Sequence, residues 1–180
     1  MIVNKSMKNT IFIYGSQYGS TKRYAEQLAK LTGLELVDYK EAKEIEKYDR
    51  IVYLGALYAG GVTGLKKTVG KMSPNQKLVI VTVGIADPTD AENIANIRRS
   101  VKTQIPAHFY DESMCLHLRG AIDYSHLGLK HRMLMSLLYS KVKKMPEEEL
   151  TSEAQALMAT YGKQVDFVDL NTLAPIVKLI

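Results

Sequence analysis

The segment that most constrains the fold of this chain is Leu78–Val83, whose sequence Leu-Val-Ile-Val-Thr-Val is almost entirely apolar. A strand with this sequence is apolar on both faces, which is typical of parallel sheets that helices cover from both sides. Shorter apolar runs lie at Ile11–Tyr14, Leu34–Val37, Ile51–Ala56 and Cys115–Ile122. The sequence therefore predicts five buried strands.

Apolar residues at helical spacing fill the intervals between these runs. Helices are expected over Tyr24–Ala29 with a stop at Gly33, Glu41–Tyr48, Leu65–Met72, Pro88–Pro106, Leu127–Met145, Ser152–Tyr161 and after a cap at Asp169, with a strand or extended segment at Val165–Val168. Strands alternating with helices predict βαβ units, and right-handed crossovers favour the strand order 2-1-3-4-5. The expected fold class is α/β: a doubly wound five-stranded parallel sheet in an α/β/α sandwich, with extra C-terminal helices.

Length and composition favour one domain over residues 1–180, because 46% of the 180 residues are hydrophobic. Residues 1–7 are expected to be a leader, and residues 125–180 a helical extension packed on or beside the sheet. A single cysteine, Cys115, cannot form an internal disulfide, which favours a reducing cytoplasm. No apolar run is long enough to predict a transmembrane helix or a secretory signal.

The loop after the first predicted strand has the composition of a phosphate-binding loop. Its residues are Ser16, Gln17, Tyr18, Gly19, Ser20 and Thr21. Small hydroxyl side chains, a glycine and the positive end of a helix are suited to an anion. The lysine of a nucleoside-triphosphate loop is absent, and the pattern differs from that of dinucleotide-binding loops. On the hexapeptide alone, a polar turn with an N-cap residue remains an equal alternative.

The segment Phe12–Thr21, followed by a helix, resembles the FMN phosphate loop of flavodoxins, whose pattern is S/T-x-x-G-x-T/S. The resemblance implies a flavodoxin-like fold with FMN as cofactor, whose phosphate is held by the six residues above without Lys or Arg. It also implies that the flavin ring lies against two further loops. These contain Ala56, Leu57, Tyr58, Ala59, Gly60 and Gly61 after the third strand, and Val83, Gly84, Ile85, Ala86 and Asp87 after the fourth.

Tyr58 is the aromatic candidate for stacking on the flavin, and Gly60 and Gly61 allow the backbone to come close to it. An ordinary turn before a helix is the alternative for these residues. The loop Gly84–Asp87 departs from the family because it lacks the usual aromatic residue. One flavin face is therefore expected to be covered by another part of the chain or left open to a substrate. Asp87 is expected to cap the following helix.

Three later segments of the sequence resemble one particular group of proteins with the flavodoxin fold. Leu118–Tyr124, a basic helix containing His131 to Met133, and Val165–Asp169 resemble the menaquinone-dependent protoporphyrinogen dehydrogenases. This implies an FMN-dependent oxidoreductase that passes electrons from a porphyrinogen to a quinone in heme biosynthesis. Two alternatives stay open: a flavodoxin-type electron carrier without its own substrate, and a non-enzymatic module. The net charge of +5 argues against a carrier, since such carriers are usually strongly acidic.

The segment Leu127–Met145 contains five cations and no acid, so it carries the whole net charge of +5. Apolar residues beside cations are suited to an anionic membrane surface or a negatively charged substrate. A cytoplasmic protein peripheral to the inner face of the membrane is one expectation, and a helix that packs on the sheet is the alternative. Nucleic acid is not expected, because aromatic residues are not interleaved with the cations. A homodimer is left open.

No residue can be nominated as catalytic from the sequence. The four histidines, His108, His117, His126 and His131, are scattered, and His126 and His131 are expected nearest the flavin end. Cys115 lies in a predicted strand and is expected to be buried and inert. No group of His, Cys, Asp and Glu has the spacing of metal ligands, so no metal is expected.

Overall fold

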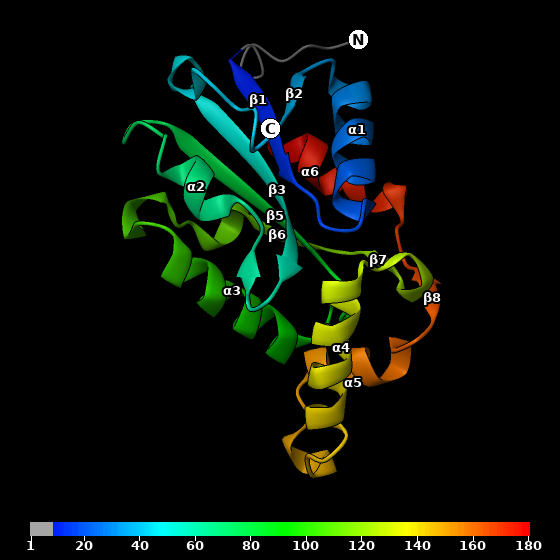
Figure 1. Cartoon of the computed structure of the whole chain (residues 1–180). Helices are drawn as coiled ribbons and strands as arrows, with labels where there is room; N and C mark the ends of the chain where they lie inside the picture. The colour runs from blue at the N-terminus through cyan, green and yellow to red at the C-terminus, as the bar shows by residue number, and fades with distance from the viewer. Residues whose placement is uncertain (1–8) are drawn as a thin grey trace.

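The computed structural model describes residues 9–180, so the expected leader at residues 1–7 lies outside the described part. The chain forms three layers, with a central sheet between two layers of helices (Figure 1). Helices α1 (Ser20–Thr32) and α6 (Ala174–Leu179) cover one face, and α2 (Leu65–Val69) and α3 (Ala91–Gln104) cover the other. The predicted α/β/α sandwich is confirmed.

The parallel strands lie in the order β2-β1-β3-β5-β6. Their bounds are Thr10–Gly15 for β1, Glu35–Asp38 for β2, Arg50–Tyr58 for β3, Lys77–Gly84 for β5 and Cys115–Arg119 for β6. If the five parallel strands alone are numbered along the chain, their order is 2-1-3-4-5, as predicted. Strand β4 (Gly61–Val62) is an addition of two residues that pairs antiparallel with the end of β3.

The position of β3 in the middle of the sheet explains why its sequence is apolar from Ile51 to Ala56. Ile51 and Tyr53 belong to the core that includes residues of α2 and α3, whereas Val52 and Leu54 belong to the core that includes α1 and α6. All four side chains are fully buried. Because successive side chains of a strand point to opposite faces, a sheet that is covered twice needs apolar residues at every position.

The expected helix over Glu41–Tyr48 is wrong, because this segment is irregular apart from a 3₁₀ turn at Ile45–Lys47. Distant side chains take the hydrogen bonds that a helix would have used. Buried Gln76 donates from Nε2 to the carbonyls of Ile45 at 2.7 Å and Tyr48 at 2.5 Å. Lys71 Nζ donates to the carbonyl of Ala42 at 2.7 Å.

The expected fifth strand, Cys115–Ile122, is divided at Gly120. Strand β6 ends at Arg119, and β7 (Ala121–Asp123) leaves the sheet to pair antiparallel with β8 (Gln164–Asp166). The amide of Gly120 donates to the carbonyl of Gly84 at 2.6 Å, and a Cβ at Gly120 would lie 3.0 Å from Ser20 Oγ. The glycine thus permits the close approach at which the chain turns out of the sheet.

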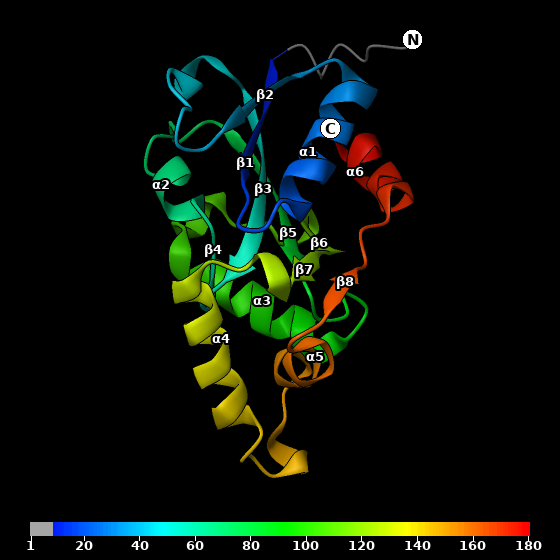
Figure 2. The ribbon, with the colours of Figure 1, turned by 45° about the vertical axis from the view of Figure 1, so that its right-hand side comes forward.

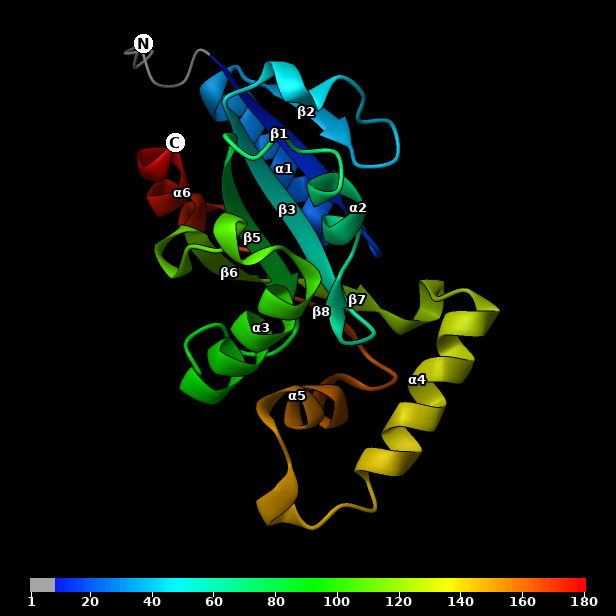
Figure 3. The ribbon, with the colours of Figure 1, turned by 90° about the vertical axis from the view of Figure 1, so that its left-hand side faces the viewer.

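The two strands β7 and β8 form a ribbon that begins and ends a long excursion of the chain. Helices α4 (Leu129–Val142) and α5 (Ser152–Thr160) lie within it, with a 3₁₀ turn at Glu147–Glu149 between them. Both helices lie beyond the carboxyl ends of the parallel strands and away from the sheet (Figures 2 and 3). After β8, Asp169 caps a 3₁₀ turn at Leu170–Leu173 that leads into α6. This confirms the cap that was expected at Asp169.

Candidate functional site

The loops after β1, β3 and β5 lie together because parallel strands end at the same edge of a sheet. They form part of the wall of a cavity of about 500 Å³. The predicted site residues on this wall are Gln17, Tyr18, Ser20, Ala56, Leu57, Tyr58, Ala59, Gly60, Gly61, Val83, Gly84, Ile85 and Ala86. The other predicted residues, Ser16, Gly19, Thr21 and Asp87, belong to the same loops but not to the wall. This cavity is the candidate functional site.

The loop after β1 is built to receive an anion at the first turn of α1. Gly19, the N-cap residue, has a left-handed backbone with φ of 94°, and its amide donates to Ser16 Oγ at 3.0 Å. Gly19 supplies no side-chain acceptor, which leaves the first amides of α1 without the cap that Ser or Asp would provide. A helix end of this kind favours a negatively charged ligand.

Two buried hydroxyl groups in this loop lack hydrogen-bond partners within residues 9–180. They are Thr21 Oγ1, on a side chain that is fully buried, and the phenol of Tyr18. Burial also raises the pKa of Tyr18. Buried polar groups are almost always hydrogen-bonded, so unpartnered ones call for a partner that the protein itself does not supply. A phosphate at the start of α1 is such a partner, and the residues present therefore fit the phosphate of FMN.

An aromatic cluster joins the loops after β1 and β3 to α4. Its members are Tyr18, Tyr58 and His131, whose rings meet edge to face with centroids 5.4–6.3 Å apart. The side chain of Gln17 is also hydrogen-bonded to His131, with 3.2 Å between Nε2 of each. His131 therefore lies at the predicted flavin end, as expected. His126 is exposed instead, and its Nδ1 is 2.8 Å from Asp123 Oδ2.

The loop after β5 differs from expectation in the role of Asp87. The cap of α3 is Asp90, whose Oδ1 accepts from the amide of Asn93 at 2.7 Å. Asp87 instead accepts from the amide and the hydroxyl of Thr89, and these hydrogen bonds lower the pKa of Asp87. The expected cap was placed too early because Pro88, taken as the helix start, precedes α3 rather than beginning it.

Apolar residues from later in the chain cover the loop that lacks an aromatic residue. Ile85 packs with a small core formed mainly by the excursion, whose other members are Tyr18, Ile122, Tyr124, Leu127, Met135, Tyr161 and Val165. Burial raises the pKa of Tyr124 to about 12. The side of the cavity next to Ile85 is therefore closed by side chains that come from β7, β8 and the helices beyond them.

Helices α4 and α5 supply much of the wall that sequence reasoning missed, and α3 adds Asn93, Asn96, Ile97 and Ser100. The lining residues are Leu134, Met135, Leu138, Lys141 and Val142 on α4 with Met145 after it, and Glu153, Ala154, Ala156, Leu157 and Thr160 on α5. The ring of Tyr139 on α4 stacks on that of Tyr161 with centroids 4.0 Å apart and planes at 7°. This stack holds α4 against the end of α5. The apolar residues of α4 lie on both faces of the helix, so their spacing alone does not mark the face toward the cavity.

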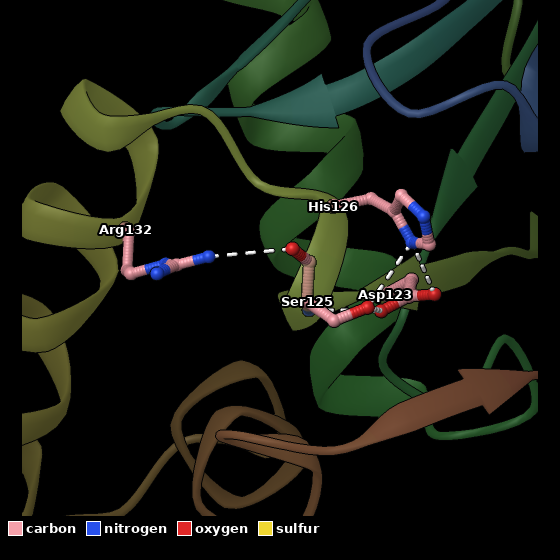
Figure 4. A network of polar contacts seen from close by, with 4 residues as sticks. All are labelled: Asp123, Ser125, His126 and Arg132. Atoms are coloured by element: carbon pink, nitrogen blue, oxygen red, sulfur yellow. Dashed lines mark hydrogen bonds and ion pairs between the residues drawn. The ribbon is translucent and has the colours of Figure 1, made fainter.

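The start of α4 is anchored by the turn that precedes it (Figure 4). Asp123 Oδ1 accepts from the amide of Ser125 at 2.8 Å and from its hydroxyl at 2.6 Å. Hydrogen bonds from Ser125 and His126 lower the pKa of Asp123 to about 2. Arg132, in the first turn of α4, donates from Nη2 to the carbonyl of Ser125 at 3.3 Å. The turn therefore fixes where α4 begins relative to the ribbon.

His117 and Cys115 lie on β6. His117 also lines the cavity, and its buried Nε2 has no hydrogen-bond partner among the described residues. Nδ1 of His117 is 2.7 Å from Thr82 Oγ1, and burial lowers the pKa of His117 to about 4. Its imidazole is therefore neutral at pH 7. Cys115 is buried, as predicted, and burial raises the pKa of its thiol to about 11. A thiol with this pKa is a poor nucleophile near neutral pH.

Replacing His117 by glutamine should reduce the loss of stability on acidification. In the unfolded chain the imidazole binds a proton near pH 6.5, but in the folded protein only near pH 4. The unfolded state thus binds more protons between these values, so His117 lowers the free energy of unfolding as the pH falls from about 6.5 to 4. Urea unfolding at pH 7 and pH 5 measures the difference. His108→Gln, at an exposed histidine in the 3₁₀ turn Ala107–Phe109, is the control, and equal pH dependence in wild type and His117→Gln would contradict this assignment.

Within residues 9–180, no helix is both long and apolar enough to cross a membrane. No group of three or more His, Cys, Asp or Glu side chains in the same range could hold a metal ion.

Comparisons with known proteins come from a family model and from solved structures. Residues 11–149 match the model of the flavodoxin domain, whereas no curated protein matches the sequence. Flavodoxin 1 of Bacillus cereus is similar, with 15% identity, 61% of this chain and 83% of that chain covered, and a TM-score of 0.39. A Fusobacterium nucleatum flavodoxin bound to flavin mononucleotide has 14% identity, 63% and 71% covered, and a TM-score of 0.42. A Lactobacillus acidophilus flavoprotein in complex with FMN has 14% identity, 62% and 91% covered, and a TM-score of 0.41.

Proposed function

The chain belongs to the flavodoxin domain family, and from this premise we propose that it holds FMN in the cavity at the carboxyl ends of β1, β3 and β5. The observation that carries the proposal is the first turn of α1. Ser20 lines the cavity there, the N-cap residue supplies no side-chain acceptor, and the adjacent buried Thr21 hydroxyl has no partner among the described residues. A volume of about 500 Å³ is within the range of about 300–1,000 Å³ that is usual for cofactor sites.

The loops after β1 and β3 have distinct roles in this proposal. Ser16, Ser20 and Thr21, with the first amides of α1, bind the phosphate through hydrogen bonds and the helix dipole. Tyr58 offers its ring to the flavin, and the glycines after it let the backbone come close. When bound, FMN supplies reversible oxidation and reduction, and the protein contributes position and electrostatics.

The cavity wall formed by α4 and α5 favours an enzyme over an electron carrier. A carrier must present its cofactor to a large protein partner, whereas here two helices lie beyond the carboxyl ends of the strands (Figure 3) and line the cavity. Leu134, Leu138 and Leu157 make this part of the wall apolar, and Lys141 and Glu153 add one charge of each sign. We therefore propose an oxidoreductase that takes electrons from a bulky, largely apolar substrate.

A porphyrinogen as electron donor and a quinone as electron acceptor satisfy these requirements, which would place the protein in heme biosynthesis. A porphyrinogen combines a large apolar ring system with carboxylates, and a quinone is an apolar ring. The support is the chemistry of the wall and the resemblance of the C-terminal half to the protoporphyrinogen dehydrogenases. No residue of the cavity is assigned as a general base, since the two-electron chemistry resides in the cofactor.

Titration of the cofactor-free protein with FMN and with riboflavin tests the proposal. FMN should bind at least about tenfold more tightly, because riboflavin lacks the phosphate that the first loop binds. Equal affinities, or no uptake of either flavin, would contradict the assignment of the loop. The loaded protein is then mixed with protoporphyrinogen and a menaquinone analogue. Turnover is expected, and a protein that binds FMN without turning over any donor would favour the electron carrier.

A further inference from the structure

Helix α4 has a second apolar face, which points away from the cavity. Leu129, Met133 and Leu137 are four residues apart and therefore lie in one row along the helix. The exposed fractions of these three side chains are 79%, 63% and 65%. The structure describes every residue of α4, and none of them is buried. The expected helix that packs on the sheet is thus wrong for this segment. A row of exposed large apolar side chains indicates an interaction surface.

Cations surround this row, and the helix contains no acid. Arg132 is exposed between Leu129 and Met133, and Lys143 and Lys144 are exposed just past the end of α4. Lys130 and Lys141 are exposed as well. The acidic turn Glu147–Glu149 begins after Pro146, outside the helix. The apolar row is therefore flanked by positive charge at both ends.

The position of α4 leaves this face free of the rest of the described chain. The helix extends away from the sheet, and its inner side is the one that meets α5 and the loops (Figures 2 and 3). A helix of 14 residues is about 21 Å long, which is too short to span a bilayer of about 30 Å. Apolar residues on one face with flanking Lys and Arg are typical of a helix that lies in the membrane interface.

We propose that the outward face of α4, defined by Leu129, Met133 and Leu137 with Arg132 and Lys143–Lys144, binds an anionic lipid surface. Charge complementarity supports this occupant, since each cation near such a surface adds attraction. A second copy of the chain does not fit, because pairing two of these faces brings Arg132, Lys143 and Lys144 of one copy against the same three cations of the other. This docking surface is separate from the FMN loops, so it does not depend on the proposed cofactor.

Cosedimentation with lipid vesicles tests the proposal. The full chain should bind vesicles of equal parts phosphatidylglycerol and phosphatidylcholine, and binding should weaken as salt screens the charges. Pure phosphatidylcholine should bind at least about tenfold more weakly. Absence of binding to the anionic vesicles, or equal binding to both, would overturn the proposal.

Two pairs of variants distinguish binding through this surface from nonspecific binding of the protein to vesicles. Leu129→Ser/Met133→Ser/Leu137→Ser should lower binding at least about tenfold, whereas Leu31→Ser, at a leucine of α1 that is 55% exposed, should not. Lys143→Glu/Lys144→Glu should also lower binding about tenfold or more, whereas Lys66→Glu/Lys67→Glu makes the same charge change on α2 without this effect.

Circular dichroism checks that these variants, all at exposed side chains, remain folded. Equal losses in the test and control variants would mean that net charge or average hydrophobicity drives binding, and would overturn the assignment to α4. Sedimentation in solution provides a further outcome. A dimer that is lost in the triple serine variant would identify a second copy as the occupant, and this too would overturn the proposal.

Discussion

Replacing Thr21 by valine should weaken FMN binding by about 10- to 100-fold while leaving the cofactor-free protein at least as stable. Valine keeps the shape and the branched Cβ of threonine but removes the buried hydroxyl that has no partner within residues 9–180. Loss of a hydrogen bond to a charged group costs about 1.5–3 kcal/mol, which corresponds to this decrease in affinity. Removal of an unpaired buried hydroxyl is neutral or stabilising for the free protein.

Fluorescence titration with FMN and urea unfolding of the free protein measure the two effects. Thr10→Val is a matched control, because Thr10 also has a buried hydroxyl without a partner but begins β1 at the end away from the loop. Riboflavin affinity should be the same in wild type and Thr21→Val. An equal loss for riboflavin would mean that the variant distorts the cavity and that the hydroxyl does not act on the phosphate.

Replacing Gln76 by leucine should lower the free energy of unfolding by about 3 kcal/mol or more. Gln76 is buried, and it donates to the carbonyls of Ile45 and Tyr48 and accepts from the amide of Ser73 at 2.8 Å. Leucine leaves these three backbone groups without partners, and each such group costs about 1–3 kcal/mol. The added apolar burial offsets only part of this loss.

Urea or thermal unfolding measures the change, and a fall in melting temperature of about 6–12 °C is expected for a domain of this size. Gln155→Leu is the control, because Gln155 is an exposed residue of α5 and its replacement should change stability by about 0.5 kcal/mol or less. A similar small change in Gln76→Leu would indicate that the segment before β3 rearranges or that water replaces the amide.

The sheet was predictable because its order follows from local patterns. Each parallel strand coincides with an apolar run, and the crossover rule then restricts the topology. The error at Glu41–Tyr48 has a non-local cause. Its charged sequence is compatible with a helix, but Gln76 and Lys71, which bind its carbonyls, lie some thirty residues away in sequence. No local pattern can reveal such partners.

The loops of the candidate site were predictable from the sequence, but the part of the cavity wall that α4 and α5 form was not. The three loops follow from their positions after parallel strands, which is a general property of these sheets. In α4, apolar residues lie on both faces, so spacing could not distinguish the face toward the cavity, with Leu134 and Leu138, from the face with Leu129 and Met133. The contact between His131 and Gln17 also depends on how α4 packs against the loops, which the sequence does not show.

The ribbon of β7 and β8 is where the excursion that contains α4 and α5 leaves the sheet and returns to it. The amide of Phe167 donates to the carbonyl of Gly120 at 3.1 Å, and the guanidinium of Arg119 lies 3.7 Å from the centroid of the Phe167 ring. The chain therefore departs from the sheet and rejoins it at neighbouring residues, while α6 completes the core independently of what lies between. Because the cost of closing a loop grows slowly with its length, helices within the ribbon can be lengthened, shortened or exchanged with the register of the sheet unchanged. One scaffold can in this way acquire covers suited to different substrates.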